Sequence, residues 1–210
     1  EIRFCDWSSD VCSSDLMGWK VGDLKEKYFE LGRRVFQKSL LRQGFLRAKY
    51  DDDELKKQLR AVYGDDTTLG SEKLRTGLLV ITKRHDTGSC WPIGNNPRGR
   101  YFGRRETAER HTLANSEYPL WQVVRASTAA PSYFESEEIT IGGSQTATTT
   151  GEFVDGGMSP FNNPALMAVM YATLEGYRLN WATGADRLLV VSVGRSEEHT
   201  SELQSQNRIS

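Results

Sequence analysis

The chain has 210 residues, enough for one domain with a sizeable core. Charged residues make up 26% and hydrophobic residues 38%, which is typical of a globular protein, and the formal net charge of -1 argues against a protein that binds nucleic acid by bulk charge. No run of about 18 apolar residues occurs, so the sequence predicts no transmembrane helix.

The two ends of the chain, residues 1–16 and 195–210, are related at the level of codons. One codon choice for residues 5–15 and one for 195–205 are reverse complements, apart from a base or two at each end. Both strings resemble the adapters of short-read sequencing libraries, so we expect the two ends to be translated adapter. The predicted domain is then residues 17–194, which we expect to be partial because such an insert is cut at arbitrary points.

Only one cysteine, Cys90, lies inside the predicted domain. A single thiol predicts no structural disulfide, which favours a cytoplasmic setting. The first residues lack the basic and apolar regions of a signal peptide. The compartment is otherwise left open, because a true targeting signal would precede the domain.

In chain order, the predicted elements begin with two amphipathic helices, at 23–43 and 51–64. The acidic triplet 51–53 fits the start of the second helix better than a metal cluster, because acidic side chains stabilise a helix N-terminus. Residues 77–84 (GLLVITKR) are apolar and β-branched and predict a buried strand. Residues 85–101 are rich in Gly, Pro and Asn and predict a loop.

The second half of the predicted domain alternates helices and strands. A helix over 120–130 is ended by Pro131, and strands at 139–141 and 151–154 flank a loop. Residues 162–164 (NNP) predict the start of another helix, with Asn163 as its N-cap and Pro164 at the first helical position. The buried stripe of this helix is expected to hold Leu166, Met167, Met170 and Leu174.

The last predicted element, residues 188–193 (LLVVSV), is almost continuously apolar. Such a run is typical of a strand in a parallel sheet that is covered on both faces. Together with the alternation of elements, it predicts an α/β fold with a doubly wound, mostly parallel sheet and helices on both faces.

Neither a metal nor a cofactor is expected. His85 and His111 have no partners at the spacing that metal ligands require, so each is interpreted as an ordinary polar residue. The basic residues between 98 and 110 would suit an anionic surface, although a solvated loop is the default interpretation.

The segment with the clearest chemical meaning is FVDGG, in which Asp155 directly follows a strand and precedes Gly156 and Gly157. Ligands and catalytic groups gather at the carboxyl ends of strands in α/β sheets. An acid held there can orient or deprotonate a nucleophile. A tight turn has the same sequence, so this motif alone leaves both interpretations open.

Three segments together resemble the patatin-like lipid acyl hydrolases: 76–97, 118–134 (with RASTAAPSYF) and 153–166 (FVDGGMSPFNNPAL). They occur in the family's order and at plausible spacing. The resemblance implies a doubly wound α/β fold and hydrolysis of acyl esters in phospholipids or related lipids by a Ser–Asp dyad. The implied partner is a lipid substrate, which exposed aromatic side chains such as Trp91 and Trp121 could meet at a membrane surface if they are not core residues.

By this resemblance, Asp155 matches the family's catalytic aspartate, and Gly156 and Gly157 complete its motif. The implied role of Asp155 is general base. No match exists for the nucleophile, because the family's G-x-S-x-G elbow occurs nowhere in the chain, and the segments at Ser144 and Ser159 lack the final glycine. We therefore expect a fragment in which the nucleophile and the oxyanion loop are missing and which is inactive by itself.

Two other functions are considered. One is a non-catalytic relative that binds lipid or protein. The other is a phosphotransfer enzyme built on Asp155, which would need a second carboxylate at a neighbouring strand end, for example Asp86 after strand 77–84. The lipid head group and the positional preference cannot be derived from these residues.

Overall fold

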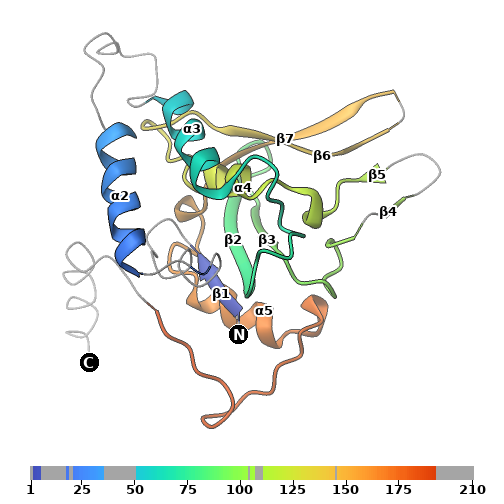
Figure 1. Cartoon of the computed structure of the whole chain (residues 1–210). Helices are drawn as coiled ribbons and strands as arrows, with labels where there is room; N and C mark the ends of the chain where they lie inside the picture. Colours follow the sequence, from blue (N-terminus) through green and yellow to red (C-terminus); the bar gives the residue numbers. More distant parts are fainter. Residues whose placement is uncertain are drawn as a thin grey trace, which may run out of the picture.

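The computed structural model describes residues 2–5, 18, 21–35, 51–103, 105–106, 111–144 and 146–192. Within these residues a seven-stranded sheet carries helices on both faces (Figure 1). The helices are α2 (Val21–Val35), α3 (Asp52–Tyr63), α4 (Leu120–Ser127) and α5 (Ala165–Thr173). The strands are β1 (Ile2–Cys5), β2 (Gly77–Arg84), β3 (Cys90–Gly94), β4 (Arg105–Glu106), β5 (His111–Thr112), β6 (Glu137–Gly143) and β7 (Thr148–Asp155).

The sheet is mixed but mostly antiparallel, and its strands are connected in the order β1-β2-β7-β6-β5-β4. One edge of β2 pairs with β1 and then with β7, and the opposite edge pairs with β3. Among the described strands only β1 and β2 pair in parallel. The prediction of an α/β class is confirmed, whereas the prediction of a mostly parallel sheet is wrong. The reason is local: short connections join β2 to β3 and β6 to β7, and such hairpins reverse the chain, whereas parallel neighbours need a long crossover.

Strand β2 is the centre of the core, as its apolar sequence predicts. Leu78 and Val80 on one face pack with residues of α4, including Val123, in the main hydrophobic cluster. Leu79 and Ile81 on the other face pack with α5. Figure 1 shows this arrangement, with β2 and β3 central, α4 beside them and α5 beneath.

Helix α3 begins as its acidic start predicts. The Asp51 side chain accepts hydrogen bonds from the backbone N–H groups of Asp53 and Glu54, so the triplet is a cap and a dipole-matched first turn. Leu55 and Leu59 are its buried face. The first predicted helix corresponds to α2, and the expected part beyond Val35 lies outside the described residues.

The sequence prediction did not include β1, β3, β4 or β5. The longest of these, β3, lies within the segment 85–101 that was expected to be a loop. Its residue Pro92 stands opposite Ile81 of β2. A strand accepts proline where no ladder hydrogen bond is needed at that position. The Gly, Pro and Asn content of the segment therefore hid a strand that tertiary pairing stabilises.

Between residues 120 and 173 the helices and strands lie where they were predicted, with a shorter first helix and longer strands. Helix α4 ends at Ser127, before Pro131, and β6 and β7 form the predicted hairpin. Helix α5 begins one residue later than predicted, with Pro164 at the N-cap position, although Asn163 Oδ1 does accept a hydrogen bond from the Ala165 N–H just before the helix. The predicted stripe of α5 is wrong in part: Leu166 is 63% exposed, and Met167, Ala168, Tyr171 and Ala172 are the buried residues.

The predicted strand at 188–193 is wrong for the part that is described, because residues 188–192 form no strand. Leu189 is 86% and Val191 73% exposed. Both edges of β2 are already occupied, one by β3 and the other shared between β1 and β7. The run pairs with no described strand, and an apolar sequence without a paired neighbour forms no ladder.

Candidate functional site

Asp155 is the last residue of β7 and lies opposite Thr82 of β2. Its backbone N–H donates a hydrogen bond to the carbonyl of Ala129, just after α4, with an N···O distance of 3.1 Å. Its backbone is therefore fixed by the sheet on one side and by the end of a helix on the other. This placement at a strand end agrees with the prediction from the FVDGG segment.

The Asp155 carboxylate caps the short 3₁₀ turn Gly156–Met158 (η2). Its Oδ1 accepts a hydrogen bond from the Gly157 N–H at 2.7 Å. A charge-assisted bond of this kind holds the carboxylate against the turn. The side chain is half-buried, so a group approaching the turn can reach it.

The two glycines of the motif are required by space rather than by a left-handed backbone. A Cβ on Gly156 would lie 2.2 Å from the Ile81 carbonyl oxygen of β2. A Cβ on Gly157 would lie 3.0 Å from Asn162 Oδ1 and 3.1 Å from Asp155 Oδ1. Neither glycine has a positive φ. The sequence prediction assigned them to a sharp turn, whereas the close approach of the turn to β2 is the stronger constraint.

Two serines lie close in sequence or space to this turn, and both hydroxyls are already engaged. The Ser127 hydroxyl donates to the Ile81 carbonyl at 2.7 Å. The Ser159 Oγ accepts from the Phe161 N–H at 3.2 Å and is hydrogen-bonded to Cys90. Ser144 stands in the β6–β7 turn, at the opposite end of β7, which is about 20 Å away at 3.3 Å per residue.

Cys90 is a half-buried thiol in this neighbourhood. Burial raises its pKa, and the hydrogen bond with Ser159 opposes that change. A thiol with a raised pKa is mostly protonated at neutral pH and is a poor nucleophile. Lys83 lies nearby, and its Nζ donates to the Met158 carbonyl at 3.0 Å, which ties the η2 turn to β2.

Asp86, the second carboxylate that a phosphotransfer site would need, lies away from Asp155. Because β2 and β7 are antiparallel, their carboxyl ends point to opposite ends of the pair. Asp86 instead forms an ion pair with Arg84, and the Arg84 hydrogen bonds hold the pKa of Asp86 below its usual range. The two carboxylates therefore do not form one site.

The predicted polar residues are accounted for by local contacts where the structure describes them. His85 Nδ1 lies 3.3 Å from Glu152 Oε1, and hydrogen bonds from Ser136 and His85 lower the pKa of Glu152. The side chain of His111 lies outside the described residues. Across the described ranges, no three His, Cys, Asp or Glu side chains gather as metal ligands would.

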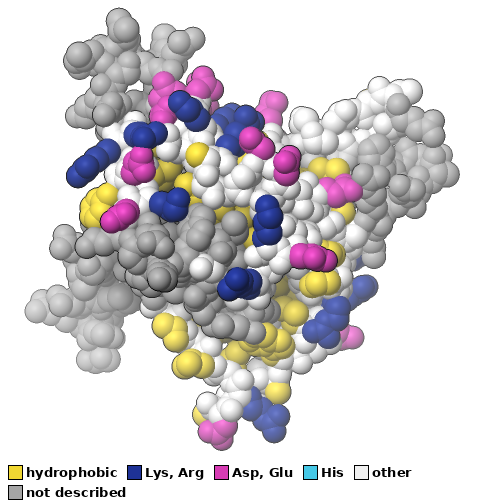
Figure 2. All heavy atoms as spheres, viewed as in Figure 1, with side chains coloured by type: hydrophobic (Ala, Val, Ile, Leu, Met, Phe, Trp, Pro, Cys, Tyr) yellow, Lys and Arg dark blue, Asp and Glu magenta, His cyan; other side chains and the backbone are white. Residues whose placement is uncertain are grey.

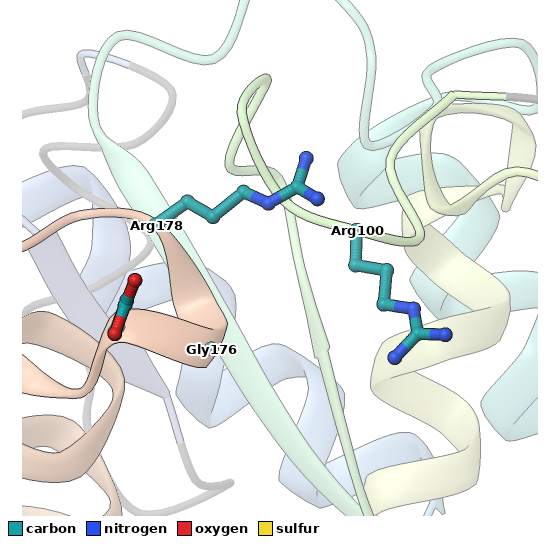
Figure 3. Close-up of a pocket in the computed structure, with 4 residues that line it drawn as sticks. Arg100, Gly176 and Arg178 are labelled. Atoms are coloured by element: carbon teal, nitrogen blue, oxygen red, sulfur yellow. The ribbon is translucent and has the colours of Figure 1, made fainter.

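A separate basic hollow of about 530 Å³ lies among Arg100, Glu175, Gly176 and Arg178 (Figure 3). The loop that carries Arg100 is tied to this region because Asn96 Nδ2 donates to the Tyr177 carbonyl at 2.7 Å. Glu175, Gly176 and Arg178 come from the segment directly after α5, and Arg100 comes from the loop after β3. Both arginines are exposed, and for Arg100 this agrees with the interpretation of residues 98–110 as a solvated loop.

The rest of the visible surface is mixed in charge. Figure 2 shows basic and acidic side chains interspersed over α2 and α3, and hydrophobic side chains emerging lower on the same face. Of the helices that the structure describes, none combines the length and apolar character needed to cross a bilayer.

Comparison with known proteins gives a consistent result. The chain matches the patatin-like phospholipase family over residues 11–169, more than half its length. It is 25% identical over 185 residues to a calcium-independent phospholipase A2-gamma of Oryctolagus cuniculus, and 24% over 187 residues to the Mus musculus protein of the same name. Each alignment covers 78% of this chain and 21% of the relative, so the chain spans about a fifth of the length of these curated relatives. The chain belongs to the patatin-like phospholipase family.

Proposed function

We propose that the chain is part of a lipid acyl hydrolase that cleaves acyl esters of phospholipids or related lipids, with Asp155 as its general base. The observation that carries the proposal is the placement of Asp155 at the end of β7, fixed through its backbone and held by the Gly157 N–H. The phospholipase names of the relatives support the substrate class.

The proposed chemistry has Asp155 accept the proton of a serine hydroxyl as that oxygen attacks the ester carbonyl. Asp155 passes that proton to the lipid oxygen as the ester C–O bond breaks, so the lipid alcohol leaves and an acyl-enzyme forms. Asp155 then assists water in releasing the fatty acid. The hydrogen bond from the Gly157 N–H orients the carboxylate for this role, and Gly156 lets the turn approach β2 closely enough to hold that orientation.

The nucleophile is a separate part of the proposal. The 210 residues contain no G-x-S-x-G segment, and the serines nearest the turn have other partners. We infer that this chain by itself does not hydrolyse esters. Without a nucleophile no acyl-enzyme can form, and the lack of an oxyanion donor typically costs a further ~10²–10³ in rate.

The test of this part uses the chain as it is. Purified chain is incubated with a fluorophosphonate serine probe and with phosphatidylcholine vesicles, and probe labelling and fatty-acid release are measured. The proposal expects no labelling and release at the buffer rate. Labelling at one serine, abolished by changing that serine to alanine, would show that a nucleophile is present after all.

The second candidate is a non-catalytic relative that binds lipid or protein, and the missing G-x-S-x-G segment is the observation that favours it. Sequencing the reading frame upstream of residue 17 distinguishes the hydrolase from the non-catalytic relative. A glycine-rich loop followed by G-x-S-x-G supports the hydrolase. An upstream frame without that elbow leaves Asp155 as a turn residue of a binding protein.

A further inference from the structure

The carbonyl of Ile81 in β2 is a point where three elements meet. The even-numbered residues of β2 direct their backbone N–H and C=O groups toward β3. The Leu78 carbonyl accepts from the Asn95 N–H, and the Arg84 N–H donates to the Ser89 carbonyl. Because these groups alternate along a strand, the Ile81 carbonyl faces the other edge, where β7 ends. There it lies against Gly156, since a Cβ on that glycine would be 2.2 Å away.

Ser127, the last residue of α4, supplies a donor to this carbonyl. The Ser127 hydroxyl is 2.7 Å from the Ile81 oxygen, and the side chain is 5% exposed. A hydrogen bond shielded from water in this way resists competition by solvent. Without it, a buried carbonyl would lose a partner at the point where the β2–β7 ladder stops.

The residues that follow Ser127 reach Asp155 directly. Thr128 closes α4 by donating its hydroxyl to the Arg125 carbonyl at 3.0 Å, and it is 1% exposed. Ala129 is fully buried, and its carbonyl accepts the Asp155 N–H at 3.1 Å. The end of α4 therefore binds β2 through Ser127 and β7 through Ala129, with a single residue, Thr128, between the two anchors.

We propose that Ser127 is a positioning residue for Asp155, a role that rests on the proposed function of that aspartate. Its hydroxyl fixes the end of α4 to the Ile81 carbonyl, and this fixes the Ala129 carbonyl that receives the Asp155 N–H. The hydroxyl is thus part of the support for the base, not a nucleophile, because its proton is committed to the Ile81 carbonyl.

The experiment compares Ser127→Ala with Ser136→Ala in this same chain. Ser136 is the matched control, since its hydroxyl also binds β7, donating to Glu152 Oε1 at 2.6 Å, three residues before Asp155. Amide hydrogen exchange is followed residue by residue by NMR, together with the pH titration of the Asp155 carboxyl carbon. Neither readout requires catalytic activity.

Ser127→Ala is expected to speed exchange at the Asp155 amide at least tenfold relative to the Ile93 amide in β3, and to shift the titration midpoint of the Asp155 carboxyl. Ser136→Ala is expected to leave both Asp155 signals unchanged.

Equal acceleration at Asp155 and Ile93 would overturn the proposal, because Ser127 would then only stabilise the fold. Unchanged Asp155 signals would overturn it as well. These outcomes are independent of ester hydrolysis, so the proposed function can fail in its own assay while this proposal stands, and the reverse.

Discussion

Two segments of the chain have similar apolar sequences but different structures: β2, with GLLVITKR, is a buried strand, whereas residues 188–193, with LLVVSV, form no strand where they are described. In β2 the apolar side chains are buried on both faces and both edges are paired. In the described part of the second segment, Leu189 and Val191 face solvent. The comparison teaches that an apolar, β-branched run becomes a strand only where the rest of the fold pairs it and buries it.

The largest expected effect tests burial with a matched pair of leucines. Leu79 of β2 is fully buried and Leu189 is 86% exposed. Leu79→Ala should lower the free energy of unfolding by about 2–5 kcal/mol, because it leaves a cavity. Leu189→Ala should change it by less than about 0.5 kcal/mol. Urea unfolding followed by circular dichroism measures both, and equal losses would contradict the comparison.

Alkaline pH should weaken the β2 core through two buried tyrosines. Burial raises the pKa of Tyr118 and of Tyr171 from 10.0 to about 12. Between pH 10 and 12 the unfolded chain releases these protons while the folded chain keeps them, so stability falls as pH rises, by about 1.4 kcal/mol per unit of pKa difference for each group. The Tyr118→Phe variant should show a shallower decline in urea midpoint across this range. An unchanged slope would exclude Tyr118 as a source.

A smaller loss is expected where the η2 turn meets β2. Gly156→Ala places a methyl group against the Ile81 carbonyl and should cost about 1–3 kcal/mol. Gly176→Ala is the control, because nothing lies within 4 Å of its Cβ position, and it should be neutral within about 0.5 kcal/mol. Thermal unfolding of the two variants gives the difference directly. If Gly156→Ala is as stable as the control, the close approach does not constrain the motif.

The smallest effect on stability is expected in the exposed segment itself. Val191→Lys should leave the urea midpoint unchanged and reduce concentration-dependent association, because a charge interrupts an exposed apolar run. Light scattering against protein concentration measures the second effect. A lower urea midpoint would mean that Val191 packs in the fold after all.

The sequence predicts well those features that depend on local rules. The capped start of α3 at Asp51, the buried strand β2 and the strand end at Asp155 all follow from residue type and spacing, and the structure bears them out. Their physical causes act over a few residues: a side chain caps a helix, or an apolar run must be buried.

The features that failed depend on partners distant in sequence. Strand β3 was missed because Pro92 is tolerated only by virtue of its position opposite Ile81. The strand at 188–193 was expected from its apolar run alone, whereas residues 188–192 pair with no described strand. The candidate site shows the same limit. Asp155 was predicted from its motif, whereas the close approach of Gly156 to the Ile81 carbonyl can be seen only in the fold. The assignment of residues 1–16 and 195–210 to translated adapter stays a prediction.

The most direct test concerns the proposal that Asp155 is the general base. The kcat for phosphatidylcholine hydrolysis is measured with and without Asp155→Asn in the longer protein that the reading frame encodes once it is extended upstream of residue 17. The account predicts a fall in kcat on the order of 10⁴-fold with KM little changed, as for loss of the carboxylate that serves a serine nucleophile. The control Asp66→Asn, at an exposed carboxylate, should keep full activity. An Asp155→Asn variant that retains kcat within tenfold of the parent would contradict the assignment of Asp155 as the base.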